Sequence, residues 1–141
     1  EKITAGLRDH PATQPGARFS VNLMPLTLMQ KEVATEICAL FERYGVAPQT
    51  VVIEITEEQA FPIQVADQNI QQLRDCGFRI AIDDFGTGYS NLHNLSSLNV
   101  DILKIDKSFI STLATNSTSH LIAEHIIEMA QSLHLKTIAE G

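Results

Sequence analysis

The sequence has 141 residues, of which 44% are hydrophobic and 19% are charged, a balance typical of one globular domain. Its 17 acidic and 10 basic residues give a formal net charge of −7, which argues against binding to a nucleic-acid polymer. No apolar run approaches the roughly 20 residues that a membrane-spanning helix needs, so no membrane segment is expected in this chain.

Short runs rich in Val, Ile and Leu alternate with segments of helical period along the chain. These runs predict strands at residues 19–24, 51–56, 79–83, 101–106 and 136–140. Strands that alternate with helices indicate an α/β fold with a parallel sheet and right-handed crossovers. Periodicity alone leaves open whether the sheet is open or closes into a barrel.

The segments between the strands predict helices. The first is expected to be capped by Thr27 and to end at Gly45, and the second is expected to end at Gly77. Residues 90–98 predict a shorter helix, and apolar residues at helical spacing over 122–133 predict the last one. Cys38 and Cys76 lie within helical patterns and have no metal-ligand spacing, so we expect reduced, buried thiols.

Polar residues recur near the carboxyl end of each predicted strand. They are Asn22, Glu54, Asp83, Lys104 and Glu140. Parallel α/β folds place their active sites at this end of the sheet, so one mouth is expected to collect all of these side chains.

Converging carboxylates repel one another unless they hold protons or bind cations. Oxygen ligands of this kind favour Mg²⁺, Mn²⁺ or Ca²⁺. The adjacent pair Asp83 and Asp84 allows one carboxylate to bridge two ions while the other binds one ion. Lys104 is placed to orient the attacking water or to neutralise charge on a phosphoryl oxygen. The set therefore indicates hydrolysis of a phosphoester.

Each of these residues also has a structural alternative. The aspartate pair is compatible with a helix cap or a solvated turn. Lys104 is compatible with a lysine whose stem lies along an apolar surface, and Glu54 with an ion-paired residue at the rim of the sheet. Asn22, three residues before Pro25, is compatible with a turn. Their shared position at strand ends favours the functional interpretation.

Four motifs in this order resemble those of the EAL-domain family: Glu-Ile-Thr-Glu at 54–57, Asp-Asp-Phe-Gly-Thr-Gly-Tyr-Ser at 83–90, Val-Asp-Ile-Leu-Lys-Ile-Asp at 100–106 and Ala-Glu-Gly at 139–141. Val-Asn-Leu at 21–23 is similar to a strand motif upstream in the same family. The Glu-Ala-Leu signature and the last two strands of the family are absent from the sequence. The resemblance therefore implies that residues 1–141 are a partial EAL domain, a TIM-like (β/α) barrel present as about five β/α units.

The resemblance implies hydrolysis of cyclic di-GMP to linear pGpG with two Mg²⁺ or Mn²⁺ ions, and inhibition by Ca²⁺. Asn22, Glu54 and Asp83 match ligands of one ion, and Asp84 and Glu140 complete a second site that shares Asp83. Lys104 matches the lysine that contacts the attacking water. Glu57 matches the glutamate that anchors loop 85–90, and Asp106 is expected near the substrate.

The resemblance further implies a homodimer and a cytoplasmic domain, in a parent protein that is membrane-tethered in some relatives. Two alternatives stay open. The first is a catalytically inactive cyclic-di-GMP receptor or protein-interaction module, because the first-strand glutamate is missing. The second is an unrelated barrel enzyme, such as a divalent-metal lyase, which the long Asp-Asp-Phe-Gly-Thr-Gly-Tyr-Ser match disfavours.

Overall fold

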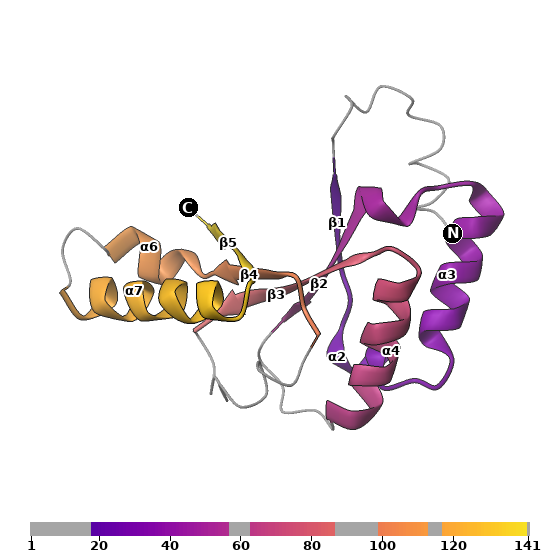
Figure 1. Cartoon of the computed structure of the whole chain (residues 1–141), viewed down its shortest axis with the longest axis horizontal. Coiled ribbons are helices and arrows are strands. Elements are labelled where there is room, and N and C mark those ends of the chain that lie inside the picture. The colour runs from indigo at the N-terminus through magenta and orange to yellow at the C-terminus, as the bar shows by residue number, and fades with distance from the viewer. Residues whose placement is uncertain (1–17, 57–62, 87–98, 113–116, 141) are drawn as a thin grey trace.

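A computed structural model of the chain describes residues 18–56, 63–86, 99–112 and 117–140 (Figure 1). Five strands form a single sheet: β1 (Phe19–Asn22), β2 (Val51–Thr56), β3 (Arg79–Phe85), β4 (Ile102–Ile105) and β5 (Lys136–Ala139). The helices are α2 (Pro25–Leu28), α3 (Val33–Tyr44), the short 3₁₀ helix η1 (Pro48–Thr50), α4 (Ile63–Asp75), α6 (Lys107–Thr112) and α7 (Ser117–Ser132). The five expected strands are thus confirmed to within two residues at each end.

Each strand pairs in parallel with the next strand along the chain, in the order β1-β2-β3-β4-β5. Helices lie between β1 and β2, between β2 and β3, and between β4 and β5, as crossovers between parallel strands require. A doubly wound sheet reverses its strand order at a switch point, and the described sheet contains no such reversal. This order is that of the wall of a (β/α) barrel, which decides the alternative that periodicity left open.

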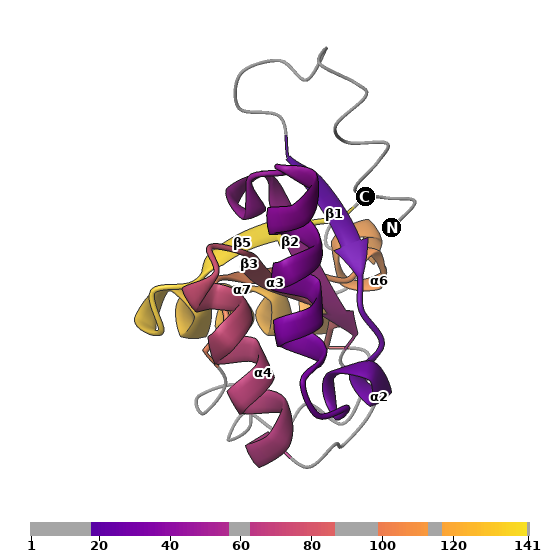
Figure 2. The same cartoon turned by 90° about the vertical axis from the view of Figure 1, so that its right-hand side faces the viewer.

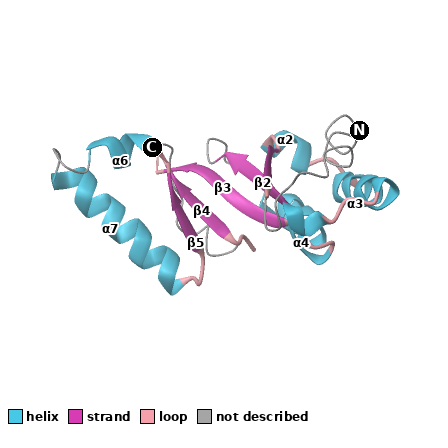
Figure 3. Cartoon of the chain, turned by 90° about the horizontal axis from the view of Figure 1, so that it is seen from above, coloured by secondary structure: helices cyan, strands magenta, loops and turns pink. Residues whose placement is uncertain are grey.

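The two faces of the sheet differ in what covers them. One continuous core joins alternate residues of β2, β3 and β4 to apolar residues of α3, α4 and α7, so these helices cover the same face. Figure 2 shows α3 beside α4, and Figure 3 shows α4 near β2 and β3 and α7 beside β5. A separate small cluster of Val52, Ala81 and Ile102 lies on the opposite face.

The helices α3, α4 and α7 end in the same way. A residue with positive φ follows each helix, namely Gly45, Gly77 and His134. Its N–H group donates to the carbonyl three residues back, and the next N–H group donates to the carbonyl five residues back. This pair of bonds is the Schellman motif, which satisfies carbonyls that the helix itself leaves open. The helix ends expected at Gly45 and Gly77 are therefore confirmed.

Other helix boundaries differ from the expectation. Thr27 lies inside the short helix α2 and does not cap the long helix, which begins after Glu32. Glu32 has a φ of 71° and makes no side-chain cap, so a kink in the chain replaces the expected cap. The short helix α6 was not expected, and the helix expected over 90–98 lies outside the described residues. None of the described helices has the length and apolarity to cross a membrane.

The two cysteines form a disulfide, so the expectation of reduced thiols is wrong. Cys38 lies in α3 and Cys76 directly follows α4, and their Cα atoms are 6.3 Å apart. The two helices also meet through a hydrogen bond of 2.8 Å from Gln72 Nε2 to Thr35 Oγ1. Because the cysteines are 38 positions apart, only the packing of α3 against α4 brings them together.

Candidate active site

Three neighbouring strands carry an apolar residue and then a charged residue on the face away from the helices. The pairs are Val52 and Glu54 on β2, Ala81 and Asp83 on β3, and Ile102 and Lys104 on β4. Members of a pair share a face because they are two residues apart in a strand. The apolar members form the small buried cluster, and the charged members lie one layer closer to the carboxyl ends. The fold therefore places a charged layer on an apolar floor.

Lys104 binds three carboxylates in this layer. Its Nζ lies 3.1 Å from Glu54 Oε1, 2.8 Å from Asp83 Oδ1 and 2.6 Å from Glu140 Oε1. Burial by itself would lower the pKa of Lys104, but the hydrogen bonds to Asp83, Glu140 and Glu54 outweigh it and raise the pKa well above its usual value. Lys104 is therefore an ammonium ion and does not act as a base.

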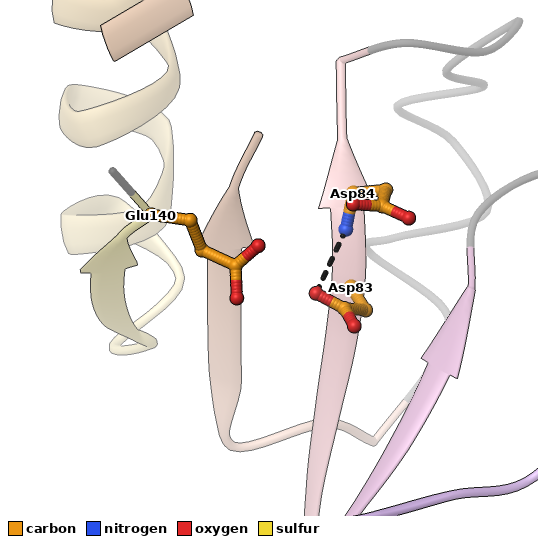
Figure 4. Close-up of side chains that lie close together, drawn as sticks. All are labelled: Asp83, Asp84 and Glu140. Atoms are coloured by element: carbon orange, nitrogen blue, oxygen red, sulfur yellow. Dashed lines mark hydrogen bonds between the residues drawn. The ribbon is translucent and has the colours of Figure 1, made fainter. Parts of the chain in front are cut away.

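A bulge brings Asp83 and Asp84 to the same side of the sheet. Consecutive residues of a regular strand point to opposite faces. In β3 the pairing with β4 shifts between Ile82 and Phe85, and Asp84 has a φ of 55° in the left-handed region. Figure 4 shows the side chain of Glu140 pointing toward this pair, and the N–H group of Asp84 donates to Asp83 Oδ1 over 3.1 Å. Both aspartates therefore lie on the face of the sheet that carries Lys104.

Carboxylate oxygens of Asp83, Asp84 and Glu140 all lie within 4.8 Å of one another. Burial raises the pKa of Asp84 above its usual value, and repulsion from Asp83 adds to the rise. Asp106 and Glu140 repel Asp84 as well, whereas the ammonium of Lys104 acts in the opposite direction. One ammonium ion therefore does not neutralise the acidic groups around it.

This donor set fits divalent cations. The three clustered groups offer only oxygen atoms, which suit Mg²⁺, Mn²⁺ and Ca²⁺ and not the sulfur-rich and nitrogen-rich sites of softer metals. The uncompensated negative charge stabilises cations further, and it adds to burial in raising the pKa of Asp84. Glu54 lies outside the three-carboxylate cluster but is joined to it through Lys104.

The other residues expected at the site have different positions. Asn22 is exposed at the end of β1, directly opposite Glu54 in the sheet register, so it borders the charged layer. Asp106 follows β4, and its Oδ1 accepts a hydrogen bond of 2.8 Å from the N–H group of Ser108. The side-chain and backbone hydrogen bonds of Ser108 lower the pKa of Asp106. Glu57, expected to anchor loop 85–90, lies outside the described residues. Its role and that of Asp106 stay predictions.

Sequence reasoning missed the bulge and the three-way pairing of Lys104. Aspartate adopts positive φ more readily than most residues, which is a weak signal for the bulge at Asp84. The alternation of Ile80 and Ile82 in the core predicts Asp84 on the helix side, and the burial of Phe85 contradicts that alternation. A core aromatic residue three positions after Ile82 is thus the signal that was available.

Comparison with known proteins agrees with this geometry. The chain is 49% identical over 141 residues to the probable cyclic di-GMP phosphodiesterase PdeA of Escherichia coli K12, and it spans 19% of that protein's length. The crystal structure of the EAL domain of Mycobacterium smegmatis DcpA matches 99% of this chain and 64% of its own chain, with a TM-score of 0.89 and 32% identity. The manganese and cyclic di-GMP complex of Klebsiella pneumoniae BlrP1 matches 98% of this chain and 35% of its own chain, with a TM-score of 0.81 and 26% identity.

The family model described as the EAL domain matches residues 1–141. EAL domains are TIM-like (β/α) barrels, and the five parallel strands in sequential order form part of such a barrel wall. The expected fold class is therefore confirmed, and the chain belongs to the EAL domain family.

Proposed function

We propose that the protein containing this chain hydrolyses cyclic di-GMP to linear pGpG with the help of two divalent cations, Mg²⁺ or Mn²⁺. The observation that carries the proposal is the single ammonium ion of Lys104 among Glu54, Asp83 and Glu140, beside the acidic group that includes Asp84. The names of the relatives support the substrate, since PdeA is named a probable cyclic di-GMP phosphodiesterase and BlrP1 was solved with manganese and cyclic di-GMP.

The carboxylates at the strand ends hold the cations in this proposal. Asn22, Glu54 and Asp83 are the ligands of one ion. Asp84 and Glu140 would hold a second ion together with Asp83, which the closeness of their three carboxylates supports. When bound, such ions supply Lewis acidity and lower the pKa of water, so that a nucleophile forms near neutral pH.

Lys104 acts through its fixed positive charge. A lysine is protonated near neutral pH, and once its carboxylate partners hold cations, the ammonium of Lys104 would donate hydrogen bonds to the attacking water and to a phosphoryl oxygen on which charge develops. Water adds to phosphorus and releases one proton, the bond from phosphorus to O3′ breaks, and O3′ takes up one proton from the solvent, so that the net reaction consumes one water. The ring of the cyclic dinucleotide opens and leaves a 5′-phosphate, as in pGpG.

The proposal also includes a homodimer and a cytoplasmic location, which the EAL motifs imply. Both rest on the motifs alone, and the disulfide between Cys38 and Cys76 does not support the location, because disulfides are rare in cytosolic proteins.

The test replaces Lys104 in the full-length protein. With Mn²⁺ and cyclic di-GMP, the K104M variant is expected to lose roughly 100- to 1,000-fold in kcat, as expected when a group that stabilises transition-state charge is removed. The matched control is K136M, which removes an exposed lysine from the next strand, β5, and is expected to stay within about twofold of the wild type.

Two results would count against the proposal. Nucleotide binding by the wild type without turnover, with either Mg²⁺ or Mn²⁺, would favour a receptor for cyclic di-GMP. Equal activity of K104M and the wild type would remove Lys104 from the reaction. Ca²⁺ added in place of Mn²⁺ is expected to support binding and to suppress turnover.

A further inference from the structure

The irregular end of β3 holds Asp84 on the charged face of the sheet through contacts made by the residues that follow it. Asp84 has positive φ, and the pairing with β4 is interrupted between Ile82 and Phe85. Such a bulge persists only when the surrounding structure fixes the chain after it. Phe85 provides the first contact, because it is buried in the core and is paired with Ile105.

Gly86 provides the second contact. It has a φ of 99°, and its Cα lies against the ring of Phe109 in α6. A Cβ atom at this position would lie 2.7 Å from Phe109 Cε2 and 3.1 Å from Cζ, closer than side chains pack. The ring of Phe109 therefore fills the space beside the backbone directly after the bulge.

The turn between β4 and α6 fixes this ring. Asp106 Oδ1 accepts the N–H group of Ser108, and the N–H group of Phe109 donates to the carbonyl of Asp106 over 3.2 Å. The N–H group of Asp106 in turn lies 3.5 Å from the carbonyl oxygen of Phe85. Phe109 is partly buried and packs on the main core. One short turn thus contacts both residues that follow the bulge.

We propose that Phe109 is a positioning residue for the second cation, because its ring braces Gly86 and thereby keeps the carboxylate of Asp84 beside Asp83 and Glu140. The proposal rests on the cation sites of the proposed function. It assigns Phe109 no contact with the cation or the substrate. Groups that hold metal ligands in place typically change metal affinity by about 10- to 100-fold when they are removed.

The experiment measures Mn²⁺ binding to the full-length protein without nucleotide, by titration calorimetry and by the electron paramagnetic resonance of free Mn²⁺. F109A is expected to weaken one of the two binding events by about tenfold and to leave the other within about threefold. F109L, which keeps most of the bulk, is expected to recover most of the loss. The matched control is I110A, because Ile110 is also partly buried on the same core but is the next residue in α6.

A double variant separates bracing from general packing. G86A places a methyl group too close to the ring of Phe109 and is expected to weaken Mn²⁺ binding. F109A makes room for that methyl group. The combined variant is therefore expected to bind Mn²⁺ more tightly than the product of the two single losses predicts. Additive losses, wild-type binding by F109A, or equal weakening by I110A would each overturn the proposal.

If F109A does not fold, as judged by circular dichroism, the comparison of F109L with I110A decides the question through the same binding measurement. Failure of this proposal is distinguishable from failure of the proposed function. Tight Mn²⁺ binding by the wild type without hydrolysis would reject the phosphodiesterase reaction and leave the role of Phe109 testable. Normal hydrolysis together with unchanged Mn²⁺ binding in F109A would reject the role of Phe109 and leave the phosphodiesterase reaction supported.

Discussion

Leu103 and Lys104 are neighbours in β4, yet they belong to opposite faces of the sheet and serve opposite purposes. Leu103 is fully buried under the helices, in the core that joins β2, β3 and β4 to α3, α4 and α7. Lys104 binds three carboxylates on the other face. The helix-covered face stabilises the fold through apolar contacts, whereas the charged layer retains mutual repulsion among its carboxylates. The comparison teaches that stability and chemistry are separated by the alternation of a strand.

The largest expected effect on stability comes from the helix-covered face. L103A is expected to lower the free energy of unfolding by about 2–5 kcal/mol, because it removes buried methyl groups and leaves a cavity. Urea unfolding of the full-length protein measures the loss, and kcat per folded molecule is expected to stay within about threefold of the wild type. A loss of kcat as severe as that of K104M, with stability intact, would break the separation of the two faces.

The disulfide between Cys38 and Cys76 is expected to have the next largest effect on the same side. In the chain-entropy account, a cross-link over 38 positions restricts the unfolded chain and stabilises the fold by about 3–4 kcal/mol. Reduction, or the double variant C38S/C76S, is therefore expected to lower the urea midpoint and to leave Mn²⁺ binding unchanged. Alkylation of both cysteines in the folded protein without any reductant would show that the bond is not formed.

The smallest expected effect on stability comes from the charged face. There, removal of a carboxylate is expected to raise the free energy of unfolding, not to lower it. The pKa of Asp84 is raised in the folded chain, so between pH 3.8 and the folded pKa the folded state binds more protons than the unfolded state. Stability is therefore expected to fall as the pH rises from 3.8 through the folded pKa of Asp84. D84N removes this penalty and preserves a residue type that tolerates positive φ.

With EDTA present at pH 7, D84N is expected to raise the free energy of unfolding by at most about 1 kcal/mol, because Asp84 is partly exposed and solvent screens its repulsion. At pH 3 the variant and the wild type are expected to agree. The same variant is expected to lose hydrolysis with Mn²⁺. If D84N were less stable than the wild type at pH 7 in EDTA, the charged layer would not be the source of repulsion that Lys104 leaves uncompensated.

The sequence was a good guide to whatever depends on simple alternation. Short apolar runs located the five strands, and the carboxyl ends of parallel strands meet, so Glu54, Asp83 and Glu140 were expected to converge and do so around Lys104. Glycines after helical runs also located two helix ends, because few other residues adopt positive φ there.

What the sequence did not reveal depends on contacts between distant segments. The third helix end uses His134, which carries no glycine signal, and the cysteines pair only because α3 packs on α4. The bulge in β3 also needs its neighbours, since the burial of Phe85 and the ring of Phe109 against Gly86 fix the chain after Asp84. Local propensity does not encode such contacts, and tertiary packing decides them.

The bulge also has a consequence for how the sequence can change. It acts as a frameshift in the alternation of β3: before it, even-numbered residues face the core, and after it, the odd-numbered Phe85 does so. A regular strand of the same length would bring Asp84 under the helices and the ring of Phe85 to the charged face, whereas deletion of one aspartate would restore the alternation with Phe85 on the core and leave one carboxylate in place of two. Selection for a well-packed Phe85 is thereby also selection for the placement of Asp84. The packing of the hydrophobic core and the chemistry of the charged face are therefore linked at this residue.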